Sequence, residues 1–149
     1  AIKMTSDGTP WRPLVHVLDI CRAIKLVLES PADAVHNQIL NVGSSTENYQ
    51  VRQIAEIVSA GLPGCHLSYG ANGGDSRSYR VSFQKIRRLI PSFECEWTAA
   101  AGVQQLLDIF RRIDMSKETF EFRSYTRLRQ LAFLFKTGQI DDRLFWSHP

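Results

Sequence analysis

The sequence predicts a mixed α/β fold, because short apolar runs containing β-branched residues alternate with segments of helical periodicity. The chain has 149 residues, of which 44% are hydrophobic and 22% charged, the usual balance for a globular domain with its own core. Its net charge of +3 is small and dispersed, so we expect no nucleic acid as a partner. No apolar run approaches the roughly 18 residues that a membrane-spanning helix requires, so we expect no membrane partner.

The elements of the first half follow from the spacing of apolar residues. Residues 14–17 are interpreted as a buried strand in which β-branched residues flank His16. The segment 19–30 repeats apolar residues every three or four positions and ends at Ser30-Pro31, which predicts an amphipathic helix. Further along we expect a strand at 38–42, a helix at 51–58 and a short strand at 66–69.

The second half is predicted from the same signals. A glycine-rich loop at 70–75 precedes a short strand at 78–81. Ser82 and Thr98 are candidate caps for two helices, which we expect to reach about residue 89 and residue 110. A last helix is expected at 125–135, followed by a turn at 141–142.

The segment from Trp11 to Asp19 is the most informative part of the chain. Arg12 lies between Trp11 and Pro13, and a guanidinium in such stiff surroundings is suited to two-point binding of a phosphate. Asp19 comes where the predicted helix begins, so it can cap that helix or stabilise its first turn, and we interpret it as structural rather than as a general base. We interpret His16 as a satisfied core histidine rather than a catalytic or metal-binding one.

Four motifs occur in a characteristic order. They are Arg-x-x-(apolar)-His-Val-x-Asp at 12–19, Asn-Gln-Ile-Leu-Asn-Val-Gly at 37–43, Asp-Ser-Arg-Ser-Tyr-Arg-Val at 75–81 with Lys85-Ile86 after it, and Trp97-Thr98 opening the helix to Phe110. In this order and spacing they resemble the extended short-chain dehydrogenase/reductases, the NAD-dependent nucleotide-sugar epimerases and dehydratases. The resemblance covers roughly residues 5–112.

The resemblance implies the C-terminal, substrate-binding part of an extended Rossmann-type epimerase, without its Gly-rich cofactor-binding half. In the family, a Gly-rich turn opens a helix and a Tyr-x-x-x-Lys pair transfers a proton. The Gly cluster at 70–74 opens no predicted helix, and no Tyr is followed by Lys four places on. We therefore expect NAD(P) to bind the full-length parent, and this chain to be an inactive fragment without catalytic, cofactor-binding or metal-binding residues. Residues 1–115 would be the substrate-binding portion and 116–149 a helical tail.

Four residues are candidates for substrate binding. By resemblance, Arg12 contacts the nucleotide diphosphate, Asn41 lies near the substrate, and Arg77 or Arg80 approaches the nucleotide. Each also has an ordinary structural interpretation: a surface arginine paired with an acid, an asparagine that satisfies loop backbone, and a solvated strand edge. Asn72 stands where several family members carry an arginine, so the second phosphate contact falls to Arg77 or Arg80.

The expected partners are a nucleotide-diphosphate sugar, the missing N-terminal cofactor domain and a second copy of the chain. Three cysteines without a Cys-x-x-Cys motif indicate reduced thiols, as in a cytoplasmic protein. Two alternatives stay open. The chain could be a non-catalytic, self-associating interaction module, or part of an extended reductase that acts on a non-nucleotide substrate.

Overall fold

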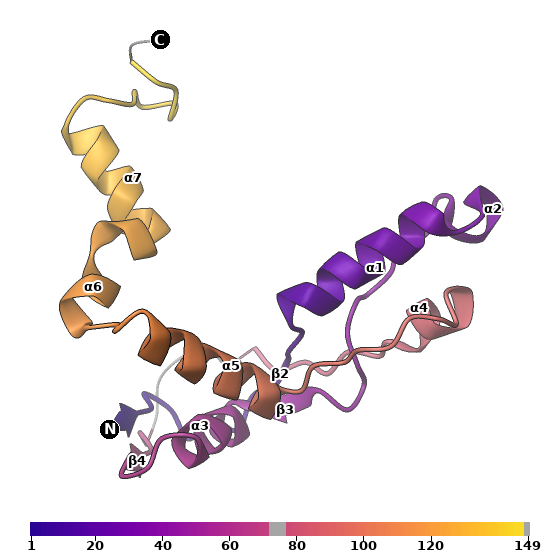
Figure 1. The fold of residues 1–149 in the computed structure, drawn as a ribbon, viewed down its shortest axis with the longest axis horizontal. Helices are drawn as coiled ribbons and strands as arrows, with labels where there is room; N and C mark the ends of the chain where they lie inside the picture. Colours follow the sequence, from indigo (N-terminus) through magenta and orange to yellow (C-terminus); the bar gives the residue numbers. More distant parts are fainter. Residues whose placement is uncertain (72–76, 148–149) are drawn as a thin grey trace. The chain divides into compact units, whose positions relative to one another are not determined.

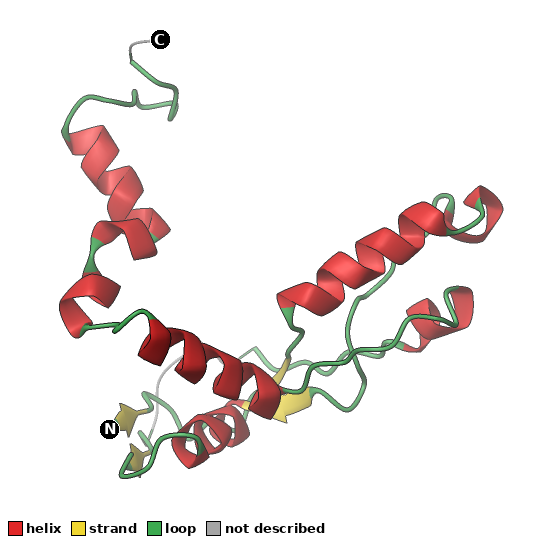
Figure 2. Cartoon of the chain, viewed as in Figure 1, coloured by secondary structure: helices red, strands yellow, loops and turns green. Residues whose placement is uncertain are grey.

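The computed structural model describes residues 1–71 and 77–147 and confirms a mixed α/β chain. The chain divides into two compact units, Ala1–Leu107 and Asp108–Pro149. Figure 1 follows the chain from one unit to the other, and Figure 2 shows that helices and loops make up most of both. Part of the predicted loop at 70–75, including Asn72, lies outside the described residues.

The first unit contains two small two-stranded sheets. In one, β1 (Ile2–Lys3) pairs in parallel with β4 (Leu67–Ser68), which confirms the strand expected at 66–69. In the other, β2 (Trp11–Pro13) pairs antiparallel with β3 (Asn48–Gln50), and Arg12 lies opposite Tyr49. The strand expected at 14–17 is therefore wrong in position, because the ladder ends at Pro13 and a helix begins at Val17.

The strands expected at 78–81 and 38–42 are not formed. The first segment does run beside β2 and β3, but side chains replace most of the backbone ladder. The Ser78 hydroxyl accepts a bond from the Trp11 N–H, and the Asn48 amide bonds both the N–H and the carbonyl of Val81. In the second segment, Leu40 and Val42 pack on the hydrophobic core. Their alternation reflects burial rather than strand pairing.

The predicted helices are confirmed with shifted ends. Helix α1 (Val17–Glu29) is capped at its start by the His16 side chain and is followed by Ser30-Pro31. Helix α3 (Val51–Ala60) begins with a capping box between Gln50 and Gln53. The Thr98 hydroxyl accepts from the Ala101 N–H at the start of α5. The remaining helices of this unit are the four-residue α2 (Ala32–Val35), α4 (Gln84–Leu89) and the first part of α5 (Ala99–Arg112).

The core of the first unit lies between α1 and the chain around α4, which run side by side in Figure 1. Its fully or nearly buried members are Ala23, Phe83, Ile86, Ile90 and Phe93. Gly43 is required at the edge of this core, because a Cβ there would lie 2.7 Å from the Phe83 ring and its φ is +152°.

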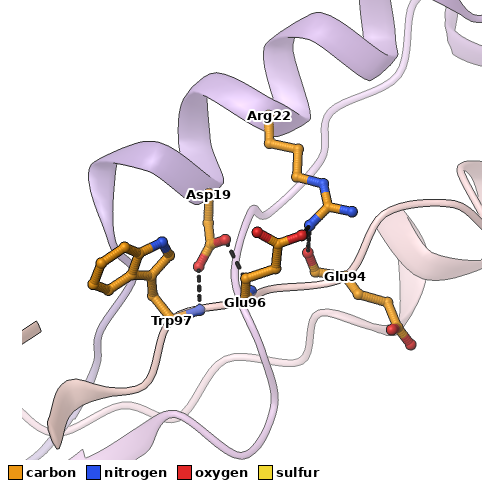
Figure 3. Close-up of polar contacts among 5 residues, drawn as sticks. All are labelled: Asp19, Arg22, Glu94, Glu96 and Trp97. Atoms are coloured by element: carbon orange, nitrogen blue, oxygen red, sulfur yellow. Dashed lines mark hydrogen bonds and ion pairs between the residues drawn. The ribbon is translucent and has the colours of Figure 1, made fainter. Parts of the chain in front are cut away.

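Asp19 holds α1 to the chain that leads into α5, as Figure 3 shows. It lies in the first turn of the helix, as expected, but its side chain is only 1% exposed. The carboxylate accepts hydrogen bonds from the backbone N–H groups of Glu96 (3.0 Å) and Trp97 (3.2 Å). Nearby, the Arg22 guanidinium donates to the Glu94 carbonyl and pairs with the Glu96 carboxylate. Asp19 therefore fixes the position of Trp97.

The second unit is helical over most of its length. It contains α6 (Lys117–Glu121), a short 3₁₀ turn (Arg123–Tyr125) and α7 (Arg127–Lys136), which confirms the helix expected at 125–135. The Arg123 guanidinium lies 4.8 Å from the Phe122 ring centre and 4.0 Å from that of Phe133. Among the residues that the structure describes, no helix has the length and apolar character needed to cross a membrane.

Candidate functional site

Arg12 lies on β2, and backbone oxygens hold its side chain. Its Nη1 donates to the carbonyls of Trp11 (2.7 Å) and Arg77. The guanidinium carbon lies 5.2 Å from the centre of the Tyr79 ring, within the range of a cation–π contact. Both of these acceptors are backbone carbonyl oxygens, and they orient the guanidinium.

The other two predicted arginines come to the same place on a separate segment. The chain from Arg77 to Arg80 follows β2, because Ser78 and Tyr79 bond the backbone of Trp11 at 3.0 and 3.3 Å. The Arg80 guanidinium lies 4.5 Å from the centre of a Trp11 ring. The structure thus places two of the predicted cations on aromatic rings, Arg12 on Tyr79 and Arg80 on Trp11, and brings the Arg77 backbone carbonyl to Arg12.

Asn41 is one of the residues that line a hollow of about 180 Å³ next to β2. Pro13 and Val81, which line the same hollow, directly follow Arg12 and Arg80 in the chain. The Asn41 side chain is exposed. Asn41 is therefore placed at the ends of the segments that carry the arginines, while the Arg12 and Arg80 side chains contact Tyr79 and Trp11.

His16 sits at the start of α1 in a set of specific contacts. Its Nδ1 accepts the Leu18 N–H (3.2 Å), so Nε2 carries the hydrogen and donates to Gln105 Oε1 (2.8 Å). The imidazole is stacked on a Trp97 ring, with centres 4.1 Å apart and planes 12° from parallel. Nδ1 thereby caps α1, and Nε2 links the start of α1 to α5.

Glu47 is a buried acid that sequence reasoning missed. Its Oε2 accepts the Tyr49 hydroxyl (2.8 Å) and the Ala99 N–H at the start of α5 (2.8 Å). Burial, then the hydrogen bond and negative charge of Glu47, raise the pKa of Tyr49 to about 12. The Thr98 cap could be predicted from neighbouring residues. The Glu47 carboxylate accepts from Ala99 across 52 residues, and no local sequence pattern indicates such a contact.

The described residues form neither a metal site nor a dinucleotide pyrophosphate site. Within residues 1–71 and 77–147, no group of three or more His, Cys, Asp or Glu side chains could hold a metal ion. The pyrophosphate of a dinucleotide needs a helix that opens on a Gly-rich turn. Helices α1, α3 and α5 begin instead after His16, Gln50 and Thr98, so the described residues do not fit that group.

Comparison with known proteins gives a family relation. A sequence model described as the NAD dependent epimerase/dehydratase family matches residues 1–43. The chain is related to the NAD-dependent epimerase/dehydratase family. The matched stretch holds β1, β2 and α1, and therefore contains Arg12 and Asn41 of the proposed site.

Individual relatives of this epimerase/dehydratase family match only part of their own length. UDP-D-apiose/UDP-D-xylose synthase from Oryza sativa subsp. japonica is 36% identical over 58 residues, which cover 39% of this chain and 14% of that protein. Two solved structures share the fold at 22% identity each. A dTDP-glucose 4,6-dehydratase from Bacillus anthracis str. Ames in complex with NAD has a TM-score of 0.56, over 74% of this chain and 34% of the other. MoeE5 in complex with UDP-glucuronic acid and NAD has a TM-score of 0.58, over 75% and 37%.

The expected fold class is corrected by this match. We expected only the C-terminal part of an extended Rossmann-type epimerase, but the family match lies in the N-terminal region of the chain, at residues 1–43. The expectation rested on the resemblance of the motifs to the substrate half of the family, together with a missing Gly-rich turn and a missing Tyr-x-x-x-Lys pair. The absence of a motif does not place a segment within a longer protein, and the matched residues do not support a C-terminal-only portion.

Proposed function

We propose that this chain binds the diphosphate of a nucleotide sugar, as a substrate-binding part of an NAD-dependent epimerase or dehydratase. The proposal is carried by Arg12 on β2 and by the segment with Arg77 and Arg80, which is hydrogen-bonded along that strand. Guanidinium groups bind phosphate oxygens through paired, charge-assisted hydrogen bonds, and three of them on two adjacent segments can span two phosphates. The contacts with Trp11 and Tyr79 order the long side chains before binding.

In this proposal the chain positions the substrate rather than transforms it. Binding of the diphosphate fixes the nucleotide, and the attached sugar is then oriented for reaction elsewhere. Asn41 lines the hollow beside β2, where its amide can bond the sugar or a phosphate oxygen. Because no Tyr-x-x-x-Lys occurs in the 149 residues, we expect no epimerase or dehydratase turnover from this chain by itself.

The proposal is tested by titration calorimetry of the 149-residue chain with UDP, dTDP, UDP-glucuronic acid and uridine. We expect the diphosphates to bind and uridine not to bind. Hydrogen bonds to charged groups contribute about 1.5–3 kcal/mol each, so Arg12→Ala should weaken diphosphate binding by about 10- to 100-fold. The matched control is Arg88→Ala, which removes an exposed arginine on α4. Equal losses in both variants, or no binding of any diphosphate, would refute the assignment and favour a non-nucleotide substrate.

Self-association is a second candidate function, favoured by one face of α1. Val17, Ile24 and Leu28 lie on one stripe of this helix and are 62%, 56% and 80% exposed. The spacing of seven and four residues is that of a helix–helix seam, so a second copy of α1 is the occupant we propose. Light scattering after gel filtration should show a dimer that Ile24→Glu converts to monomer. A monomeric wild-type chain at 100 times the concentration used for calorimetry would exclude it.

A further inference from the structure

We propose that a cavity between α3 and α5 binds a small, mostly apolar molecule that donates one hydrogen bond to Glu47. The cavity measures about 350 Å³, which is within the size range of small-molecule sites. Its lining contains none of the arginines at β2, although it shares Leu14 and Val15 with the hollow beside Asn41. Three features carry the inference: its apolar walls, one buried acceptor and a rigid polar frame.

The walls come from three parts of the first unit and are mainly aliphatic. Val15 and Val17 contribute from the chain entering α1, Ile54 and Ile57 from α3, and Val103 from α5. Apolar walls favour a ligand that loses unfavourable contact with water on entering. They also disfavour phosphates, whose charge would lose its hydration without gaining a cation.

Glu47 supplies the acceptor. The residue lines the cavity and is only 8% exposed. Its Oε2 is engaged by Tyr49 and Ala99, whereas Oε1 accepts no hydrogen bond from any residue that the structure describes. Nor is Oε1 among the described side-chain atoms that are sealed from solvent without a partner. Oε1 therefore keeps some accessible surface and can accept a hydrogen bond from a donor that enters the cavity.

The polar groups around Glu47 are held in place by one another. His16 and Gln105, which also line the cavity, are hydrogen-bonded together, and His16 is stacked on Trp97. Trp97 is in turn held by the buried Asp19. Since these contacts exist without a ligand, the site is organised in advance and little order remains to be imposed on binding.

This combination selects a ligand class. A one- or two-ring molecule with a single hydroxyl or N–H group fills such a volume and satisfies Oε1. The probes are therefore 4-ethylphenol and 4-ethylanisole, in which a methyl group replaces the donor hydrogen. A hydrogen bond to a charged acceptor contributes about 1.5–3 kcal/mol, so the phenol should bind at least about tenfold more tightly than the anisole.

Two variants locate the binding. Glu47→Gln keeps the shape of the side chain but can turn its amide NH₂ toward the ligand, so the preference for the phenol should fall below threefold. Gly102→Leu places a side chain at the cavity wall, and its Cβ would meet His16 Cδ2 at an ordinary contact distance of 3.7 Å. This variant should abolish binding of both probes. Ala101→Leu adds the same side chain at an exposed position of α5 and should leave binding unchanged.

The measurement is ligand-observed NMR with calorimetric titration of the 149-residue chain, and circular dichroism verifies that each variant folds. Equal affinity for the two probes, or undiminished binding in Gly102→Leu, would overturn the proposal. If Glu47→Gln does not fold, the probe pair and the two leucine variants still decide it. Titration of UDP into Gly102→Leu separates this site from the proposed diphosphate site, because its affinity should match that of the wild-type chain.

Discussion

Replacing Asp19 should destabilise the first unit more than any surface change of the same kind. The carboxylate is 1% exposed and accepts two backbone hydrogen bonds, from Glu96 and Trp97. Asp19→Ala removes both and leaves two N–H groups facing an apolar side chain. Each bond to a charged acceptor contributes about 1.5–3 kcal/mol, and adjacent bonds are not additive. We expect a loss of about 3–4 kcal/mol in the free energy of unfolding.

Asp19→Asn refines the test because it keeps the shape of the side chain. Its amide retains one oxygen acceptor and turns an NH₂ group toward the second backbone N–H, so we expect about half the loss, ~2 kcal/mol. The comparison variant is Asp33→Ala, which removes an exposed acid from the first turn of α2 and should cost no more than about 0.5 kcal/mol.

Urea denaturation followed by tryptophan fluorescence measures these differences, because Trp97 lies at the affected contact. The transition midpoint should fall in the order wild type, Asp33→Ala, Asp19→Asn, Asp19→Ala, with an unchanged slope. An Asp19→Ala chain within 1 kcal/mol of the Asp33→Ala chain would refute the assigned role of the carboxylate.

Three further predictions concern packing and titration. Gly43→Ala should lower the free energy of unfolding by about 2 kcal/mol or more, because its Cβ would overlap the Phe83 ring; an unchanged thermal midpoint would contradict this. Burial, then the charge of the neighbouring Asp19, raises the pKa of Cys95 to about 11, so iodoacetamide at pH 8 should label the exposed Cys21 well before Cys95, as mass spectrometry of timed samples would show. The pKa of Tyr49 is raised to about 12 in the folded chain. The stabilising contribution of the neutral Tyr49 hydroxyl is therefore present below pH 10 and is lost as the pH rises through 12. Tyr49→Phe should remove this loss from alkaline denaturation curves.

The longer helices were predictable because their signals are local, whereas the short helices α2 and α6 were not predicted. Apolar residues at three- and four-residue spacing specify α1 and α3, and Ser30-Pro31 and Gly61 end them. The boundary of α1 moved by two residues because the His16 side chain, not Asp19, caps it. A cap of this kind is readable within a few residues of sequence, and only the identity of the capping side chain was missed.

The strands were less predictable because pairing depends on distant partners. Val15 and Val17 have strand propensity, yet the residues that precede them form the ladder with β3. At 78–81 the register is set by Ser78 and Asn48, whose bonds to Trp11 and Val81 cross 67 and 33 residues. Such side-chain substitutes for a ladder leave no periodic pattern in the sequence.

The same contrast explains what sequence reasoning could say about the candidate site. Arg12 was chosen from one motif and Arg77 and Arg80 from another, and backbone and hydroxyl contacts hold the second segment beside β2. The arginines could be selected because the chemistry of each residue can be read from the sequence. The contact between their two segments cannot, because it depends on residues far apart in the chain. Glu47 could not be selected from its residue chemistry, because an acid just before a strand is common. Its role depends on the hydrogen bond from the Ala99 N–H.

Burial therefore separates the two kinds of site in this chain. The arginines at β2 remain partly or fully exposed, where a charged ligand can reach them and where salt should weaken its binding. Glu47 is largely buried beside apolar walls, where a neutral donor gains most from the same kind of contact. Raising the salt concentration should consequently reduce UDP affinity severalfold while leaving 4-ethylphenol affinity nearly unchanged. Equal sensitivity of the two ligands to salt would show that they compete for one charged surface.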